Sequence, residues 1–459
     1  MRFDANILLL TDSYKATHWK QYPPGTEQIY SYFESRGGRF AEVVFFGLQY
    51  YLKHYLAGAV VTEAGIDEAE RCWAQHFGRD DLFNRTGWEH VLRAHGGRLP
   101  VSIRAAPEGT PVPVRNVLMT IENTDPACCW LTNHLETLLV QIWYGSTVAT
   151  LSREMKRMIS SYLERTGDPE LVGLKLQDFG FRGASSVESA ALGGAAHLLS
   201  FEGTDVIAAC RLAEEYYGAD MPGVSIPAAE HSTITAWGRE HELRAFRNML
   251  EQFPTGLVAC VSDSYDIFEA CAKLWGTELR DQVLARDGTL VVRPDSGDPP
   301  STVQRVLELL GRAFGTQENA KGFRLLAPQV RVIQGDGIDY ETADAILRTM
   351  EVAGWSADNI TFGMGGALLQ KLNRDTQQFA FKCSAITQAG RSRDVYKDPV
   401  GDAGKKSKAG RLKLVRTADG HYETRSEAAD GADVLVDVFC DGELLADWSF
   451  DAVRRNAAL

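Results

Sequence analysis

Four apolar runs in the second half of the chain each lead into a turn rich in glycine or aspartate, and helical patterns lie between them. The runs occupy residues 257–261, 289–292, 330–333 and 360–362. Strand-like runs that alternate with helical segments are typical of a parallel sheet covered by helices. This part of the chain, from about Leu174 onward, is therefore predicted to be an α/β domain.

The spacing of these units favours an irregular (β/α) barrel over residues 146–390, since their polar residues all follow the strands. A doubly wound sheet is the alternative, although no GxGxxG or Walker A pattern supports it. Residues 1–145 combine a helical segment at 66–77 with an alternating, extended stretch at 99–122, and they predict a second, α+β domain. The segment 391–459 is expected to pack back on that domain.

Helix starts follow several of the turns. The segment Ser301-Thr-Val-Gln304 has the pattern of a capping box, and Asp339 is placed to cap the helix after it. A helix start presents free N–H groups and the positive end of a dipole, which suits phosphate.

The turns themselves offer groups for phosphate and sugar. Gly363-Met-Gly-Gly366 is interpreted as a phosphate cradle with Arg374 downstream, because glycine lets a backbone approach a ligand closely. The aspartates that follow the other strands are acceptors for hydroxyl groups; they are Asp263, Asp295 and Asp336. A ribose phosphate ligand is predicted. The alternatives are ordinary tight turns and a structural ion pair between Arg293 and an aspartate at these strand ends.

An aromatic ring and a guanidinium occur together in Asp178-Phe-Gly-Phe-Arg182. Phe179 suits stacking on a flat heterocycle, and Arg182 suits pairing with an anion. His231 lies among small residues that would let a ligand approach. A core phenylalanine and a structural histidine are the alternatives.

Composition narrows the range of partners. The net charge of −13 disfavours nucleic acid unless a local basic patch exists, and only the run at 405–413 approaches one, as a solvated loop or an anion-facing flap. The eight cysteines show no CxxC pair, so neither a zinc site nor a disulfide framework is indicated. No segment resembles a signal peptide or a membrane span, and a cytoplasmic location is expected.

Several long motifs resemble those of the nicotinamide phosphoribosyltransferase family, in one order from near residue 6 to Ser449-Phe-Asp451. They are Thr11-Asp-Ser-Tyr-Lys15, Tyr30-Ser-Tyr-Phe-Glu34, Asp178-Phe-Gly-Phe-Arg-Gly183, Gly203-Thr-Asp205, Pro227-Ala-Ala-Glu-His-Ser-Thr-Ile-Thr-Ala-Trp-Gly238, Val261-Ser-Asp-Ser-Tyr-Asp266, Arg293-Pro-Asp-Ser-Gly297, Val332-Ile-Gln-Gly-Asp-Gly337, Phe379-Ala-Phe-Lys-Cys383 and Tyr396-Lys-Asp-Pro399.

The resemblance implies synthesis of nicotinamide mononucleotide and diphosphate from nicotinamide and phosphoribosyl pyrophosphate, within NAD salvage. It also implies a homodimer with shared active sites, Mg²⁺ bound through the diphosphate, and stimulation by ATP through phosphorylation of His231. No nucleic acid or membrane partner is implied.

The resemblance also assigns roles by matching position. Phe179 and Tyr14 of the partner subunit would enclose the pyridine ring, with Arg293 nearby, and Asp205 would accept from the carboxamide. The groups taking part in catalysis would be His231, Asp263, Asp295 and Arg293. The diphosphate would meet Arg182, His231, Arg293, Arg36, Lys382 and Lys397. The ribose and its phosphate would meet Arg293, Asp295, Gly335, Asp336, Gly365, Gly366 and Arg374, and Asp12 would be a further binding position.

Asp205 also bears on the choice of substrate. Two like charges about 4 Å apart cost roughly 4 kcal/mol at an effective dielectric constant of about 20, so an ionised Asp205 favours the amide over nicotinate. Nicotinate phosphoribosyltransferase is therefore the alternative activity. A phosphosugar aldolase or isomerase would not explain Phe179 beside Arg182, and a non-catalytic ribonucleotide-binding homologue would not need the charged residues.

Three features depart from the family pattern. The segment at 37–44 is short, Gln177 stands where histidine is expected, and Ala367 stands where a third glycine is expected. Ala367 should be tolerated if it is already helical.

Overall fold

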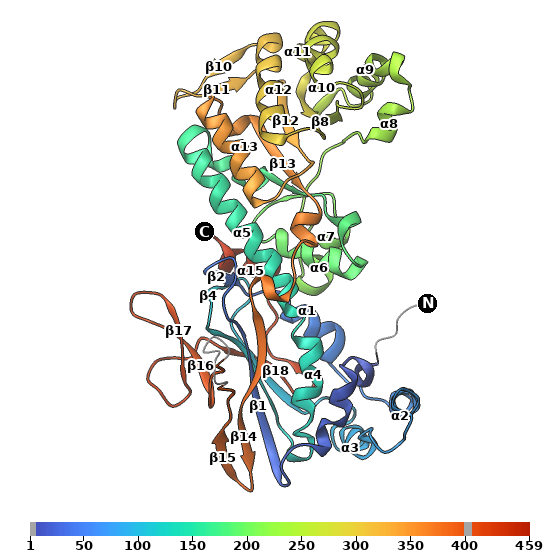
Figure 1. Cartoon of the computed structure of the whole chain (residues 1–459), viewed down its shortest axis with the longest axis vertical. Coiled ribbons are helices and arrows are strands. Elements are labelled where there is room, and N and C mark those ends of the chain that lie inside the picture. The colour runs from blue at the N-terminus through green and yellow to red at the C-terminus, as the bar shows by residue number, and fades with distance from the viewer. Residues whose placement is uncertain (1–5, 399–405) are drawn as a thin grey trace. The chain divides into compact units, whose positions relative to one another are not determined.

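The structure is a computed structural model that describes residues 6–398 and 406–459, and they form two compact units. The first unit is built from the residues up to Thr150, from Glu215–Gly218 and from Asn373–Ala458. The second consists of Leu151–Glu214 and Ala219–Leu372. Segments from the N-terminal and the C-terminal parts of the chain thus both contribute to the first unit (Figure 1).

The second unit contains a six-stranded parallel sheet, as the apolar runs predicted. Its strands lie in the order β7 (Gly203–Thr204), β6 (Leu176–Asp178), β13 (Ile360–Met364), β12 (Val330–Gln334), β9 (Asp287–Arg293) and β8 (Thr255–Val261). The four apolar runs form four consecutive strands of this sheet, β13, β12, β9 and β8. The turns that follow these strands therefore lie together at the carboxyl end of the sheet.

A short segment joins the two outer strands of this sheet. The N–H of Thr204, in β7, donates to the carbonyl of Val224 at 3.0 Å, and the N–H of Ala259, in β8, donates to the carbonyl of Pro227 at 2.9 Å. Single parallel bridges accompany these hydrogen bonds at both places. Residues 224–229 thus satisfy part of the backbone that the edges of an open sheet would leave unpaired.

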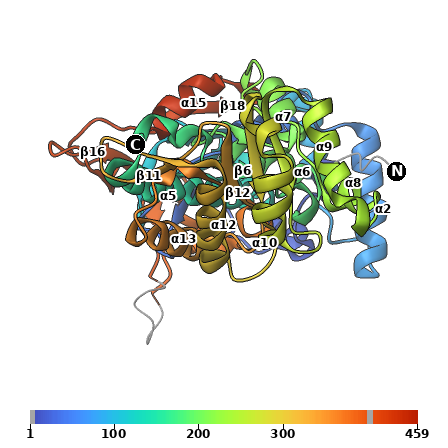
Figure 2. The ribbon, with the colours of Figure 1, turned by 90° about the horizontal axis from the view of Figure 1, so that it is seen from above.

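Helices accompany the parallel sheet: α6 (Val187–His197), α7 (Ile207–Tyr217), α8 (His231–Thr235), α9 (Glu242–Gln252), α10 (Ile267–Glu269), α11 (Arg280–Leu284), α12 (Pro299–Phe314), α13 (Tyr340–Val352) and α14 (Gly366–Leu369). Helix α5 spans Ile142–Thr166. In Figure 2, α12 lies between α13 and α10, and it also packs against β12. It buries Val303, Val306, Leu307 and Leu310 on one face, the spacing expected of an amphipathic helix.

The helix caps agree with the sequence at one position and differ at another. Asp339 caps α13 by accepting from the N–H of Thr342, as predicted. The predicted box beginning at Ser301 is wrong, because α12 begins earlier, with Asp298 as its cap and Pro299 in its first turn. Proline suits that position, since its missing N–H would have no intrahelical partner there.

The first unit is organised around a seven-stranded antiparallel sheet. The strand order is β15 (Arg391–Asp394), β14 (Phe379–Gln388), β1 (Thr26–Ser35), β5 (Val117–Asn123), β3 (Val101–Ala105), β18 (Val436–Cys440) and β19 (Glu443–Leu444). Strand β14 precedes residue 390, the expected end of the other domain, yet it pairs with β1 in this sheet. The chain thus contains both the predicted α+β region, built from its N-terminal and C-terminal parts, and a parallel α/β region.

Smaller elements complete both units. The first contains α1 (Leu48–Tyr51), α2 (Glu63–Phe77), α3 (Arg85–His95), α4 (Leu131–Leu139) and α15 (Phe450–Ala457). It also contains two antiparallel strand pairs, β2 (Glu42–Val44) with β4 (Pro111–Pro113) and β16 (Leu412–Arg416) with β17 (Tyr422–Ser426). The second contains β10 (Thr316–Glu318) paired with β11 (Arg324–Leu326). Within the described ranges, no helix combines the length and the apolar character that crossing a bilayer requires.

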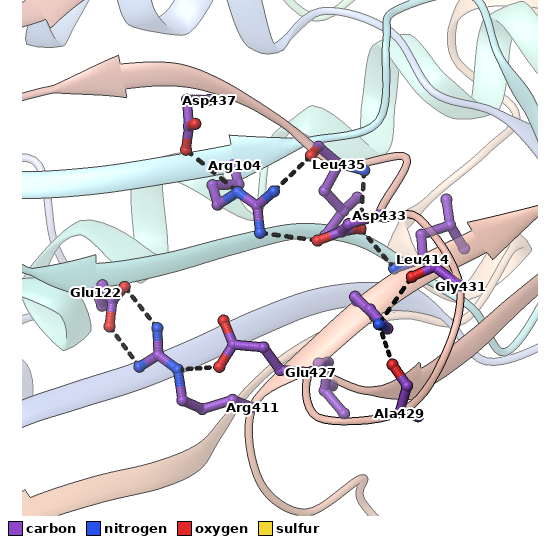
Figure 3. A network of polar contacts seen from close by, with 12 residues as sticks. Arg104, Glu122, Arg411, Leu414, Glu427, Ala429, Gly431, Asp433, Leu435 and Asp437 are labelled. Atoms are coloured by element: carbon purple, nitrogen blue, oxygen red, sulfur yellow. Dashed lines mark hydrogen bonds and ion pairs between the residues drawn. The ribbon is translucent and has the colours of Figure 1, made fainter.

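The basic run at 405–413 has structural partners where it is described. Arg411 donates to both carboxylate oxygens of Glu122, at 2.6 and 2.8 Å, and to Glu427 at 2.7 Å (Figure 3). Lys413 donates to the carbonyl of Gly431 at 2.9 Å, and Lys408 pairs with Glu34. Lys405 lies outside the described residues. The pairings with Glu122 in β5 and Glu34 in β1 attach this segment to the antiparallel sheet, a role that neither sequence interpretation anticipated.

Candidate active site

A cavity of about 860 Å³ opens in the second unit where the parallel strands end. Ten of the residues singled out in the sequence line it: Phe179, Arg182, Asp205, His231, Arg293, Asp295, Gly335, Asp336, Gly365 and Gly366. They come from turns that are far apart in the sequence. These turns come together because parallel neighbouring strands all end on the same side of the sheet.

Phe179 forms part of the floor of this cavity. It packs against the buried cluster of Ala259, Val291 and Ile333, which are residues of β8, β9 and β12. A Cβ atom added at Gly363 would lie only 2.1 Å from Cε2 of the Phe179 ring. Glycine at 363 thus leaves the space that the ring occupies.

We expect Gly363→Ala to destabilise the protein, because the new methyl group and the Phe179 ring would overlap. Overpacking of this kind costs about 1–3 kcal/mol. Thermal unfolding followed by circular dichroism measures the effect. An unchanged melting temperature would show that the ring has room to move.

Arg293 lies between the aromatic ring and an acid. Its guanidinium carbon is 5.3 Å from the centre of the Phe179 ring, and its Nη2 donates to Oδ1 of Asp295 at 2.8 Å. A Cβ atom added at Gly335 would lie 3.2 Å from Nε and from Nη2 of Arg293. An ion pair between Arg293 and an aspartate, the structural alternative, is thus present; the partner is Asp295, and both residues line the cavity.

His231, the first residue of α8, is held by one carboxylate and lies near a second. Its Nε2 lies 2.9 Å from Oδ1 of Asp263, and its Nδ1 lies 3.9 Å from Oδ2 of Asp295. The hydroxyl of Ser296 donates to the other oxygen of Asp263 at 2.6 Å. The His231 side chain is 48% exposed whereas that of Asp263 is 4% exposed, so a buried acid orients an accessible imidazole.

Asp205 is fixed at the cavity wall by two contacts. Its Oδ1 accepts from the hydroxyl of Ser225 at 2.5 Å, and its N–H donates to the carbonyl of Asp178 at 3.0 Å. The Asp178 side chain is fully buried, and its Oδ1 accepts from the N–H of Gly180 at 2.7 Å. Burial and, to a smaller extent, the charge of Asp205 raise the pKa of Asp178 to about 7, although the hydrogen bond from Gly180 opposes this shift.

The raised pKa of Asp178 predicts a pH dependence of stability. Between about pH 4 and about pH 7 the folded protein keeps a proton that the unfolded chain has released, so the free energy of unfolding falls as the pH rises through this window. The loss is at most about 4 kcal/mol. Urea unfolding at several pH values measures it.

Asp178→Asn should make that dependence shallower, because asparagine does not titrate. Asp336→Asn, at an exposed turn of the same unit, serves as the matched control. Equal slopes for the Asp178 variant and the control would remove Asp178 as the source.

The glycine-rich turn at 363–366 leads into α14, whose first residue is Gly366. Gly365 has a φ of −99°, and a Cβ atom added at Gly366 would meet nothing within 4 Å. The fold therefore does not itself require glycine at 366. Ala367 lies within α14, so the expected condition for tolerating alanine there is met.

Comparison with known proteins identifies the family. The sequence model of the nicotinate phosphoribosyltransferase (NAPRTase) family matches residues 174–443, and that of the nicotinamide phosphoribosyltransferase N-terminal domain matches residues 6–103. The chain belongs to the nicotinate phosphoribosyltransferase family.

Individual relatives within this family extend over the whole chain. Nicotinamide phosphoribosyltransferase of Xanthomonas campestris is 52% identical, with 100% of this chain and 99% of the relative covered. The enzyme of the same name from Acinetobacter baylyi is 35% identical over 100% of this chain and 98% of the relative. The crystal structure of nicotinate-nucleotide pyrophosphorylase from Pyrococcus furiosus shares the fold, with a TM-score of 0.62, 15% identity, and coverage of 100% and 97%.

Six residues predicted from the family resemblance lie in the first unit: Asp12, Tyr14, Arg36, Arg374, Lys382 and Lys397. Burial lowers the pKa of Lys382, and the positive charges of Arg36, Arg374 and Lys397 lower it further. These four residues are here called the basic cluster, because the charges of the other three act on Lys382. Tyr14 is 58% exposed.

Some cavity residues were missed in the sequence. Lys371 lines the cavity and follows the glycine-rich turn by five residues, so its charge was a usable signal. Glu230 and Ser232, on either side of His231, line it too. The role of Ser225 as a partner of Asp205 had no sequence signal.

Gln177, one of the departures from the family pattern, lies against Gly203 in β7. A Cβ atom added at Gly203 would be 2.1 Å from Nε2 of Gln177.

Proposed function

We propose that the protein transfers the phosphoribosyl group of phosphoribosyl pyrophosphate to nicotinamide, and so forms nicotinamide mononucleotide and diphosphate in NAD salvage. The observation that carries this proposal is the meeting of Phe179, Arg293 and Asp205 in one cavity with the turn at 363–366. The two full-length relatives described above carry the name of this activity.

The chemistry asks mainly for positioning and charge. The bond between C1 of the ribose and the diphosphate oxygen breaks, and its electron pair leaves with the diphosphate. The pyridine nitrogen then donates its lone pair to the oxocarbenium-like C1. Such a reaction needs aligned reactants and complementary charges, and it needs no covalent nucleophile.

The pyridine ring is assigned to Phe179 and Asp205. The Phe179 ring offers a flat apolar face, and Arg293 beside it supplies positive charge. Oδ1 of Asp205 already accepts a hydrogen bond from the hydroxyl of Ser225. Oδ2 is therefore assigned to the N–H of the carboxamide, and Tyr14 of the partner subunit to the opposite face of the ring.

The phosphates and the ribose are assigned to the remaining groups. Arg182, His231 and Arg293 face the diphosphate, while Asp295, Gly335 and Asp336 take the ribose. Gly365, Gly366 and Arg374 take the 5′-phosphate. We assign the rest of the basic cluster and Asp12 to substrate binding within a homodimer whose sites are shared.

Gly366→Ala tests the place of the phosphate. A Cβ atom at 366 meets no protein atom within 4 Å, so the stability of the free protein should not change. It would occupy space that the phosphate needs, and we expect the KM for phosphoribosyl pyrophosphate to rise by about 10- to 100-fold. Steady-state kinetics and a melting curve measure the two effects. A normal KM would place the phosphate elsewhere.

Magnesium and ATP belong to the same proposal. Asp263 and Asp295 flank His231 with oxygen donors, the ligand type that Mg²⁺ prefers, and Mg²⁺ is usually held by one or two carboxylates together with substrate phosphates. When bound, it would neutralise charge on the departing diphosphate. We assign phosphorylation by ATP to His231, whose Nδ1 keeps a lone pair while Nε2–H donates to Asp263.

For the fold, we propose that the six-stranded sheet and residues 224–229 together make an irregular (β/α) barrel. The bridges to both edge strands support this description.

One experiment tests the activity. The protein receives phosphoribosyl pyrophosphate, Mg²⁺ and equal amounts of nicotinamide and nicotinate, with and without ATP, and mass spectrometry resolves the two mononucleotides. We expect mainly nicotinamide mononucleotide, and more of it with ATP. Predominant nicotinate mononucleotide would overturn the substrate assignment. The absence of both products would overturn the assignment of catalysis. If His231→Ala retained the full ATP stimulation, the phosphohistidine assignment would fail.

A further inference from the structure

Two histidines and an aspartate meet at one point of the first unit, and none of them lines the cavity described above. His90 and His95 lie on α3, and Asp125 lies between β5 and the short 3₁₀ helix Pro126–Cys128. We propose that these three residues, here called the triad, bind a divalent transition-metal ion, and that Zn²⁺ is the ion that suits them best.

The distances suit a metal site. Nε2 of His90 and Nε2 of His95 each lie 2.7 Å from Oδ2 of Asp125, and the three ligand atoms lie within 4.8 Å of one another. Neighbouring ligand atoms of a tetrahedral zinc site lie about 3.3 Å apart, given bonds of about 2.0–2.1 Å. Small side-chain movements would therefore admit an ion between them.

The fold holds the aspartate in the orientation that a ligand needs. Oδ1 of Asp125 accepts from the N–H of Ala127 at 2.8 Å, because Asp125 caps the 3₁₀ helix. This hydrogen bond leaves Oδ2 for the histidines. A second partner that orients a ligating carboxylate is the usual arrangement around metal ligands.

The end of α3 brings the two histidines together. They are five residues apart, so on a continuing α-helix their side chains would point about 140° apart. His95 is the last residue of α3, and Gly96 follows it with a φ of +60°. The imidazole at the helix end reaches the same carboxylate oxygen as that of His90. Their ring centres are 5.7 Å apart.

The charge and the exposure of the triad also favour a cation. Burial would raise the pKa of Asp125, but hydrogen bonds from His90, His95 and the Ala127 N–H lower it to about 2, so the carboxylate is ionised at neutral pH. The side chains of His90, His95 and Asp125 are 39%, 25% and 22% exposed. Solvent therefore reaches the triad, and water is available as a fourth ligand.

The donor set selects the kind of ion. Two imidazole nitrogens and one carboxylate suit Zn²⁺ and similar borderline ions, whereas Mg²⁺ and Ca²⁺ prefer oxygen ligands alone. This proposed site therefore differs in its chemistry from the Mg²⁺ expected with the diphosphate. A bound ion would link the end of α3 to the segment that follows β5.

The test measures zinc binding itself. The full-length protein is freed of metal with a chelator and titrated with ZnCl₂ alone, in competition with a chromophoric chelator. We expect His90→Gln, His95→Gln and Asp125→Asn each to weaken one binding event by more than about 100-fold, since losing a ligand should cost more than losing an outer-shell partner.

The variants include their own controls. Asn is a good helix cap, so Asp125→Asn keeps the hydrogen bond to Ala127 and should fold even if a histidine variant does not. His421→Gln removes an exposed histidine whose Nε2 lies 3.8 Å from Asp419, with no third ligand recorded among the described residues. It should bind zinc as the unchanged protein does.

Two results would overturn the proposal. One is the absence of zinc binding in the unchanged protein, and the other is an affinity for Asp125→Asn equal to that of His421→Gln. Replacing Zn²⁺ with Co²⁺ gives a second measurement, because the visible absorption of Co²⁺ reports its coordination. The absorption should weaken or shift in each triad variant and stay the same in His421→Gln. Neither measurement depends on transferase activity.

Discussion

Replacing Asp205 with asparagine will reduce the preference for nicotinamide over nicotinate, by up to about a thousandfold. The wild-type carboxylate repels the carboxylate of nicotinate, and at about 4 Å this repulsion is worth roughly 4 kcal/mol at an effective dielectric constant of about 20. The asparagine is neutral, so it removes the repulsion. Its side-chain carbonyl still accepts from an amide N–H.

The ratio of kcat/KM for the two substrates, measured in competition, is the appropriate readout. Ser225→Ala is a matched control, because it removes the hydrogen bond to Oδ1 of Asp205 while keeping the charge. It should weaken nicotinamide binding and leave nicotinate disfavoured. An unchanged ratio for Asp205→Asn would show that another group selects the amide.

Arg293→Ala should lower kcat/KM by about 100- to 1000-fold, the usual cost of losing one group that stabilises charge in the transition state. The variant loses the cation beside Phe179 and leaves Asp295 without the partner that now lies 2.8 Å away. The loss should appear in kcat as well as in KM, because charge develops on the diphosphate as it leaves.

Arg293→Lys provides the comparison. Lysine keeps the positive charge but lacks the fork that now directs Nε and Nη2 to Oδ1 of Asp295. It should recover only part of the activity. Melting curves for both variants separate a folding defect from a catalytic one. If Arg293→Ala stayed within about tenfold of the wild type, charge stabilisation by Arg293 would be rejected.

The sequence allowed the parallel sheet and most of the cavity to be predicted, because both depend on local patterns. Buried parallel strands have apolar sequences, and the turns after them lie together wherever the strands are adjacent. Phe179 and Arg293 were found in this way, whereas the role of His231 was predicted from the family resemblance. The partners that hold these residues, such as Ser225 for Asp205, depend on contacts that no local pattern records.

The misses have physical reasons as well. Strand β14 reads like another strand of the α/β region, and only its pairing with β1 assigns it to the antiparallel sheet. Ser301 was predicted as the helix cap, because the two prolines before it were not recognised as the first turn of α12. The triad was not predicted from the sequence, because Asp125 is 30 residues from His95. The sequence pattern expected of a zinc site was a pair of closely spaced cysteines.

The pairing of β1 with β14 also sets an order of events during synthesis. Strand β1 ends at Ser35, whereas its neighbour β14 begins at Phe379, so at translation rates of about 5–20 residues per second one edge of β1 waits roughly 20–70 s for its partner. The strands of the second unit all emerge within that interval. The nascent first unit therefore exposes an unpaired strand edge, which can pair with other strands until β14 emerges.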